Sequence, residues 1–160
     1  MNSLLPWFAL TLTFIFPFQV FAESRHALVI GNNDYQNARK LVNPINDASV
    51  IASSLKSAGF TVAITTDANL KDMKGAVREF IQSLPEKGIA LVFFAGHGVE
   101  VKGQNYLIPV DATMAEEYEV PDETVSMNSI LRGLEQAKTS LNILVLDCCR
   151  DDPYSRSWRG

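Results

Sequence analysis

The chain contains 160 residues, of which 47% are hydrophobic and 20% are charged, so we expect one folded domain rather than several domains or a disordered chain. Its 14 Lys and Arg are outnumbered by 18 Asp and Glu, which gives a formal net charge of -4. This acidic balance provides no basic surface, and we therefore do not expect nucleic-acid binding.

The first 22 residues differ in composition from the remainder. They contain no Asp, Glu, Lys or Arg, hold five of the nine Phe, and end in Val20-Phe21-Ala22. This pattern is typical of a secretory signal peptide cut after Ala22, which would leave a domain at residues 23–160 and export it to the periplasm or the cell exterior. Because no basic side chain precedes the apolar segment, an uncleaved membrane anchor is the alternative interpretation.

Apolar patterning predicts alternating strands and helices in the first half of the domain, with breaks at Gly and Pro. The expected elements are a buried strand over residues 26–30, a helix from Pro44 to Gly59, a strand over 60–65 and a helix over 70–84.

The second half begins with the longest apolar run after residue 22, which predicts a central strand. The expected elements are that strand over residues 89–95, a hairpin within 99–110, a helix over 127–137 with Ser126 as N-cap, and a buried strand over 141–146. Strands that alternate with helices favour an α/β fold with a parallel sheet and helices on both faces.

Reactive side chains follow two of the predicted strands: His97, between Gly96 and Gly98, and Cys149. In parallel sheets the active groups lie beyond the carboxyl ends of the strands. A thiolate needs a partner that accepts its proton, an imidazole suits that role, and flanking glycines let N–H groups approach an oxyanion. The alternative interpretation is a tight turn beside a buried structural cysteine. The two His and two Cys of the chain lack the spacing of a zinc site, so we expect no metal.

Five segments, in this order and spacing, resemble the large-subunit region of the caspase-like cysteine peptidases, and most closely bacterial metacaspase-like members. They are RHALVIGN (25–32), LVNPINDA (41–48), FFAGHG (93–98), YLIPVD (106–111) and LDCCR (146–150). The resemblance covers nearly all of residues 25–158. It implies a caspase-like α/β/α sandwich with a mostly parallel central sheet.

By this resemblance, His97 is the catalytic histidine and Cys149 the nucleophile, while Cys148 occupies a variable position. The backbone N–H groups of Gly98 and Cys149 would form the oxyanion hole. Metacaspases and paracaspases prefer Arg or Lys before the cleaved bond, and the matching pocket acids are Asp47 and Asp147. Two carboxylates beside a slot favour a cationic side chain, although Asp47 also suits the first turn of a helix.

The sequence departs from the family pattern after Cys149, where only eleven residues follow. The family's small-subunit strands are not among them, so we expect an exposed sheet edge that can pair with another chain, including a second copy. No acidic cluster supports calcium dependence, and no cofactor is implied. Adjacent Cys148 and Cys149 could be oxidised together after export, although neighbouring cysteines bridge only with strain.

The leading hypothesis is therefore a cysteine endopeptidase that cleaves peptides after Arg or Lys through Cys149 and His97. The alternative is a non-catalytic caspase-like module that binds basic peptides or partner proteins. A redox role for the two cysteines is a weaker hypothesis, because redox thiols usually stand two residues apart.

Overall fold

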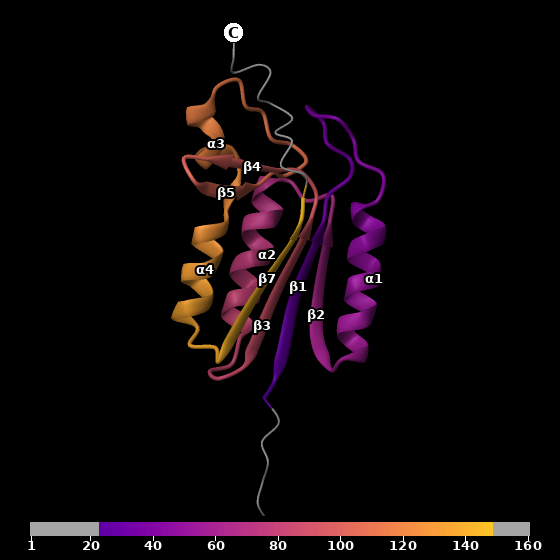
Figure 1. Cartoon of the computed structure of the whole chain (residues 1–160), viewed down its shortest axis with the longest axis vertical. Coiled ribbons are helices and arrows are strands. Elements are labelled where there is room, and N and C mark those ends of the chain that lie inside the picture. The colour runs from indigo at the N-terminus through magenta and orange to yellow at the C-terminus, as the bar shows by residue number, and fades with distance from the viewer. Residues whose placement is uncertain (1–22, 149–160) are drawn as a thin grey trace, which may run out of the picture.

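A computed structural model describes residues 23–148 of the chain. Its centre is a four-stranded sheet of β1 (Arg25–Gly31), β2 (Phe60–Thr66), β3 (Ile89–Ala95) and β7 (Leu141–Asp147). All neighbouring strands are parallel and their order is β2-β1-β3-β7 (Figure 1). The four strands predicted from the apolar runs are thus confirmed, each within one residue at either end.

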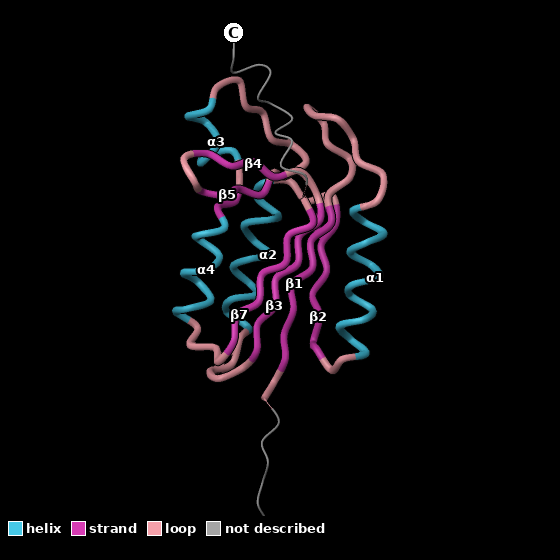
Figure 2. The backbone as a smooth tube through the Cα atoms, viewed as in Figure 1, coloured by secondary structure: helices cyan, strands magenta, loops and turns pink. Residues whose placement is uncertain are grey.

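Helices cover both faces of this sheet, which makes the fold a caspase-like α/β/α sandwich (Figure 2). Helix α1 (Pro44–Ser57) lies on one face, where it packs small side chains such as Ala48 and Ala52 against β1 and β3. Helices α2 (Leu70–Ser83) and α4 (Met127–Gln136) lie on the other face. Ser126 is the N-cap residue of α4, as predicted, although its side chain makes no capping hydrogen bond.

The larger core lies on the side of α2 and α4, because the strand residues that point there are bulkier. The fully buried side chains on this side include Leu28, Ile30, Phe94 and Met73. Pro44 at the start of α1 and Asn69 at the N-cap of α2 set where these helices begin, and the Asn69 side chain accepts a hydrogen bond from the amide of Asp72.

A small antiparallel sheet lies beyond the carboxyl end of the main sheet (Figure 1). Its strands are β4 (Gly98–Val101), β5 (Gln104–Leu107) and β6 (Val125–Ser126). Lys102 and Gly103 join β4 to β5 with φ of 51° and 75°, the conformation of a two-residue hairpin turn. The predicted hairpin is confirmed. The short helices η1 (Glu117–Glu119) and α3 (Val120–Glu123), together with β6, were not predicted.

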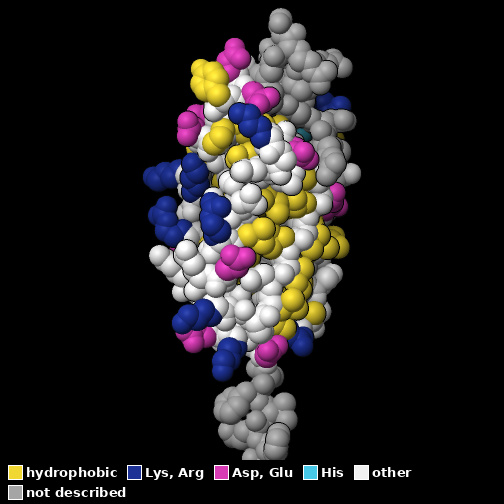
Figure 3. All heavy atoms as spheres, turned by 60° about the vertical axis from the view of Figure 1, so that its left-hand side comes forward, with side chains coloured by type: hydrophobic (Ala, Val, Ile, Leu, Met, Phe, Trp, Pro, Cys, Tyr) yellow, Lys and Arg dark blue, Asp and Glu magenta, His cyan; other side chains and the backbone are white. Residues whose placement is uncertain are grey.

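Strand β7 is less buried than its apolar sequence predicts. Leu141 and Val145 are 49% and 41% exposed, so the prediction of a buried strand over residues 141–146 is wrong. Within residues 23–148, β7 forms one edge of the sheet, and α1 packs on β1, β2 and β3 instead. Hydrophobic side chains form a stripe on this side of the molecule (Figure 3).

Two segments that carry predictions lie outside the described residues. They are the predicted signal peptide at residues 1–22 and residues 149–160, which include Cys149. Among residues 23–148, no helix has the length and hydrophobicity needed to cross a membrane.

Candidate active site

The carboxyl ends of β1, β3 and β7 meet in one row at the edge of the sheet. Gly31 is paired with Ala95, and Ala95 with Asp147. The amide of Gly96 then donates to the carbonyl of Asp147 at 3.3 Å, so the chain entering His97 is tied to the strand that leads to Cys149. The predicted adjacency of the two strand ends is confirmed for the part of each strand that the structure describes.

His97 is buried, with only 6% of its surface exposed. Its amide donates to the hydroxyl of Tyr35 at 2.7 Å, and its carbonyl accepts from the amide of Ile108 at 3.0 Å. The imidazole also lies against the Tyr35 ring, with 4.5 Å between ring centroids. Backbone and ring are therefore both fixed by buried neighbours.

The His97 imidazole has a defined tautomer. Its Nε2 lies 2.8 Å from the backbone carbonyl oxygen of Arg39. Because a carbonyl only accepts hydrogen bonds, Nε2 must carry the proton, and in the neutral ring Nδ1 then holds the lone pair. His97 is thus set up to accept a proton at Nδ1.

The two glycines beside His97 are required by close packing. A Cβ on Gly96 would lie 2.5 Å from the Tyr35 hydroxyl, and a Cβ on Gly98 would lie 3.0 Å from the Cys148 sulfur. Neither position has room for a side chain unless neighbouring atoms move. Gly98, predicted to donate to an oxyanion, therefore sits directly beside the residue that precedes Cys149.

Cys148 has a half-buried side chain that packs against the core on the α2 and α4 side. It also lines a small cavity of about 20 Å³ together with Gly98, Tyr106 and Leu146. The predicted nucleophile Cys149, and with it the possible bond between the two cysteines, lies outside the described residues.

The two predicted pocket acids lie at the carboxyl end of the sheet on separate elements. Asp47 is half-buried in the first turn of α1, where its carboxylate also faces the positive end of the helix dipole. Asp147 is the exposed last residue of β7. Neither carboxylate forms an ion pair within residues 23–148.

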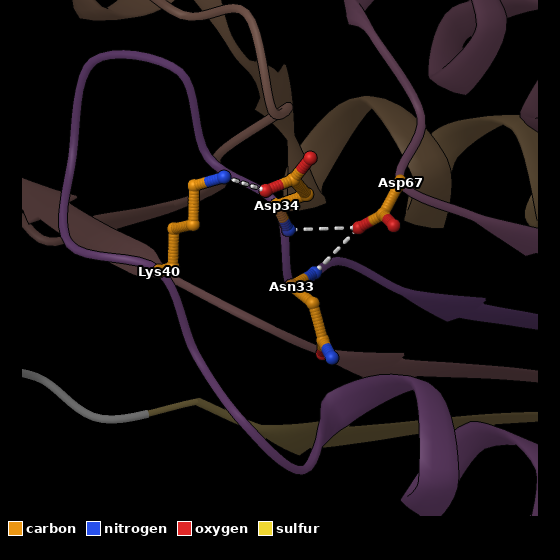
Figure 4. A network of polar contacts seen from close by, with 4 residues as sticks. All are labelled: Asn33, Asp34, Lys40 and Asp67. Atoms are coloured by element: carbon orange, nitrogen blue, oxygen red, sulfur yellow. Dashed lines mark hydrogen bonds and ion pairs between the residues drawn. The ribbon is translucent and has the colours of Figure 1, made fainter.

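A network around Asp67 was missed by the sequence analysis (Figure 4). Asp67 directly follows β2, and its Oδ1 accepts from the amides of Asn33 and Asp34 at 2.7 and 2.9 Å. An exposed ion pair between Asp34 and Lys40 closes over the same loop. The sequence shows a run of polar residues after the first strand. It does not show that the carboxylate of Asp67, 34 residues further along the chain, binds the backbone of this run.

Asn32 is the second polar anchor of this region and is completely buried. Its Oδ1 accepts from the amide of Ala68 at 3.0 Å, and its Nδ2 donates to the carbonyl of Ile108 at 3.3 Å. It joins the loop after β1 to the loops after β2 and β5. Neither this role nor the acceptor role of the Arg39 carbonyl has a recognisable sequence signature.

The residues that the structure describes include no group of three or more His, Cys, Asp or Glu side chains that could hold a metal ion. His97 offers an imidazole in a fixed orientation that can accept a proton at Nδ1. The backbone N–H group of Gly98 lies next to it in the chain, just after β3.

The amino acid sequence was compared with protein-family models and with known proteins. Residues 24–159 match the caspase domain. The chain is 33% identical over 132 residues to the human mucosa-associated lymphoid tissue lymphoma translocation protein 1 and equally to its mouse homolog. It is 27% identical over 136 residues to a paracaspase of Dictyostelium discoideum.

These alignments cover 82% of this chain against the human and mouse proteins and 81% against the Dictyostelium protein. They span only 16% of the mammalian proteins and 32% of the paracaspase. The caspase domain match, over residues 24–159, includes all four strands of the main sheet, its helices and the loop that carries His97. The sequence comparison therefore identifies the same fold as the structure. The chain belongs to the caspase domain family of peptidases.

Proposed function

We propose that this protein is a cysteine endopeptidase that cleaves after Arg or Lys, with Cys149 as nucleophile and His97 as base. The observation that carries the proposal is the hydrogen bond from His97 Nε2 to the Arg39 carbonyl at 2.8 Å. It leaves Nδ1 as the proton acceptor, at the end of the strand next to the one that leads to Cys149.

The reaction proceeds in two halves. His97 Nδ1 takes the proton of the Cys149 thiol, and the sulfur attacks the peptide carbonyl. The amides of Gly98 and Cys149 donate to the oxyanion of the tetrahedral intermediate. Collapse breaks the C–N bond, and His97 gives its proton to the leaving amine. Water, deprotonated by His97, then hydrolyses the thioester and restores the thiol.

Substrate preference would come from Asp47 and Asp147. A guanidinium or ammonium group gains charge-assisted hydrogen bonds from two carboxylates, whereas an acidic side chain is repelled. Both acids lie at the carboxyl end of the sheet, with Asp147 exposed and Asp47 half-buried, which supports their access to a substrate side chain.

The test compares fluorogenic peptide amides that end in Arg, Lys or Asp, with reduced full-length protein and with or without calcium. We expect turnover of the Arg and Lys peptides, a loss of at least about 10³-fold in Cys149→Ala, and retained activity in Cys148→Ala. Equal activity of Cys149→Ala and the parent protein would refute the assignment of the nucleophile.

A non-catalytic module is the second candidate, and it is favoured by β7, which forms an edge of the sheet within residues 23–148 and has exposed apolar side chains. It predicts that basic peptides bind to Cys149→Ala as well as to the parent, and that neither turns them over. The same edge supports self-association of two copies by strand pairing. Sedimentation of the parent against Val145→Lys, which places a charge on that strand, distinguishes a dimer from a monomer.

Export is proposed from the composition of residues 1–22. Expression with and without this segment in a bacterial host, followed by fractionation and mass measurement of the mature chain, tests cleavage after Ala22. An intact mass in the membrane fraction would favour the anchor instead.

A further inference from the structure

Asp67 takes no part in the proposed reaction, yet it holds the start of the loop that contacts His97. Its Oδ1 accepts from two successive amides, those of Asn33 and Asp34, at 2.7 and 2.9 Å. Figure 4 shows this carboxylate pointing from the end of β2 toward the backbone just after β1. An ionised acceptor makes such bonds stronger than a neutral one.

The backbone of Asp67 is adapted to this contact. Its φ is 45°, in the left-handed region that only Gly, Asn and Asp adopt readily. Its amide donates to the carbonyl of Gly31 at 3.0 Å. Asp67 therefore bonds to the chain on both sides of Asn32 and clamps the point where β1 becomes a loop.

Asn33 extends this clamp to the far end of the loop. Its carbonyl accepts from the amide of Leu41 at 3.0 Å, and its Nδ2 donates to the carbonyl of Val42 at 3.3 Å. Its Oδ1 accepts from the amide of Ile45, in the first turn of α1, at 3.0 Å. The segment between Asn33 and Leu41 is thus a closed loop, and Arg39 lies within it.

Other contacts of the loop lie nearer its middle, and among them the buried Tyr35 hydroxyl accepts from the His97 amide at 2.7 Å and donates to the Ile108 carbonyl at 3.3 Å. The amide of Gln36 donates to the carbonyl of Val110 at 2.8 Å, and the Asn37 side chain donates to Ala112 and Thr113. These contacts support the outer part of the loop. Among the described residues, the amides of Asn33 and Asp34 have the Asp67 carboxylate as their acceptor.

We propose that Asp67 is a positioning residue for His97: its carboxylate fixes the base of the 33–41 loop, and the loop presents the Arg39 carbonyl to Nε2. This inference rests on the proposed function, in which His97 is the base. A shift of about 1 Å at Arg39 would lengthen the 2.8 Å bond beyond hydrogen-bonding range. The imidazole would then lose the acceptor that fixes its tautomer, although the Tyr35 ring still packs against it.

Three substitutions separate this role from a merely structural one. Asp67→Gly tolerates the positive φ and removes the acceptor, whereas Asp67→Asn also tolerates it and keeps Oδ1. Lys40→Gln removes the exposed ion pair on the same loop and serves as the matched control. If Asp67→Gly does not fold, Asp67→Ser takes its place, since its shorter side chain does not bring an oxygen to both amides. Asp67→Glu is then its control, because it carries the same strain at the positive φ but keeps a carboxylate.

Two readouts are made on the full chain. Turnover of the Arg peptide should fall roughly 10- to 100-fold in kcat for Asp67→Gly, with a smaller change in KM, because a misplaced base slows chemistry more than binding. NMR of the His97 Nε2–H proton, assigned by its loss in His97→Gln, should show faster exchange with water in Asp67→Gly. Asp67→Asn and Lys40→Gln should stay within about threefold of the parent in both readouts.

The outcomes separate the two proposals. If Asp67→Gly has parental kcat and parental Nε2–H exchange, the positioning role is wrong. It is also wrong if kcat falls only in proportion to the unfolded fraction, measured in the same buffer, while exchange is unchanged. If the parent protein shows no turnover at all, the proposed function fails, and Nε2–H exchange alone then decides whether Asp67 positions His97.

Discussion

The two ends of the main sheet are built by different means. At the amino ends of the strands, backbone bonds join the turn before β3 to the turn before β7: the amide of Lys87 donates to the carbonyl of Lys138 and that of Ser140 to the carbonyl of Gly88, at 3.0 and 2.9 Å. The side-chain bonds at this end are exposed or half-buried, such as the one from the Arg25 guanidinium to the Ala58 carbonyl at 2.8 Å. At the carboxyl ends, side chains such as Asn32 and Asp67 reach across to backbone groups of distant loops. Joining two turns takes mainly backbone bonds, whereas holding an imidazole in one orientation needs side-chain anchors from several strands.

The largest effect that this comparison predicts is at Asn32. Asn32→Leu keeps the volume but leaves the buried amide of Ala68 without its acceptor, so we expect a loss of about 2–3 kcal/mol in the free energy of unfolding. Urea denaturation measures this change.

Asn142→Leu is the matched control at the amino end of the sheet. Asn142 is half-buried, and within residues 23–148 its Oδ1 accepts from the Thr139 hydroxyl, which also contacts the Leu134 carbonyl. We expect a change below about 1 kcal/mol. Equal losses at both asparagines would mean that the ends of the sheet do not differ in how they depend on side chains.

A smaller effect on stability, with a selective effect on activity, is expected at Tyr35. Tyr35→Phe removes the buried hydroxyl that accepts from the His97 amide at 2.7 Å. We expect a loss of about 1–2 kcal/mol in unfolding free energy and roughly a tenfold lower kcat on the Arg peptide.

Tyr106→Phe provides the control for the loss of a tyrosine hydroxyl. The Tyr106 hydroxyl donates to the Gln104 side chain at 3.2 Å, within the hairpin itself. Its removal should leave kcat within about twofold of the parent. If both variants lose activity equally, the bond to the His97 amide has no special role.

The amino acid sequence predicted the scaffold because apolar periodicity and Gly or Pro breaks act locally. Strands β1 and β3 and helix α2 appear where the pattern placed them, and the helix after Pro44 ends before Gly59. The burial of β7 was overestimated, since apolar content does not tell whether a strand is central or at an edge.

The candidate site was predictable only in part. His97 stood out because glycines flank it at a strand end, and the structure shows it buried with a defined tautomer. The Arg39 carbonyl and the Asp67 clamp could not be predicted, because a backbone acceptor has no side-chain signature and the partners lie 58 and 34 residues apart. The catalytic roles of His97 and Cys149, the oxyanion role of Gly98 and the pocket roles of Asp47 and Asp147 stay predictions.

The smallest effect is expected at Lys138, in the turn before β7. Its Nζ lies 3.3 Å from Glu86 Oε1, but both side chains are about 70% exposed, so water screens the pair. Lys138→Gln should change the unfolding free energy by less than about 0.5 kcal/mol and leave kcat unchanged. The Lys87 amide donates to the Lys138 carbonyl, and this backbone bond joins the turn before β3 to the turn before β7. A substitution of the Lys138 side chain leaves both of its atoms in place. A loss above about 1 kcal/mol, insensitive to salt, would show that a side chain also holds the amino end, and the contrast between the two ends would then be one of degree.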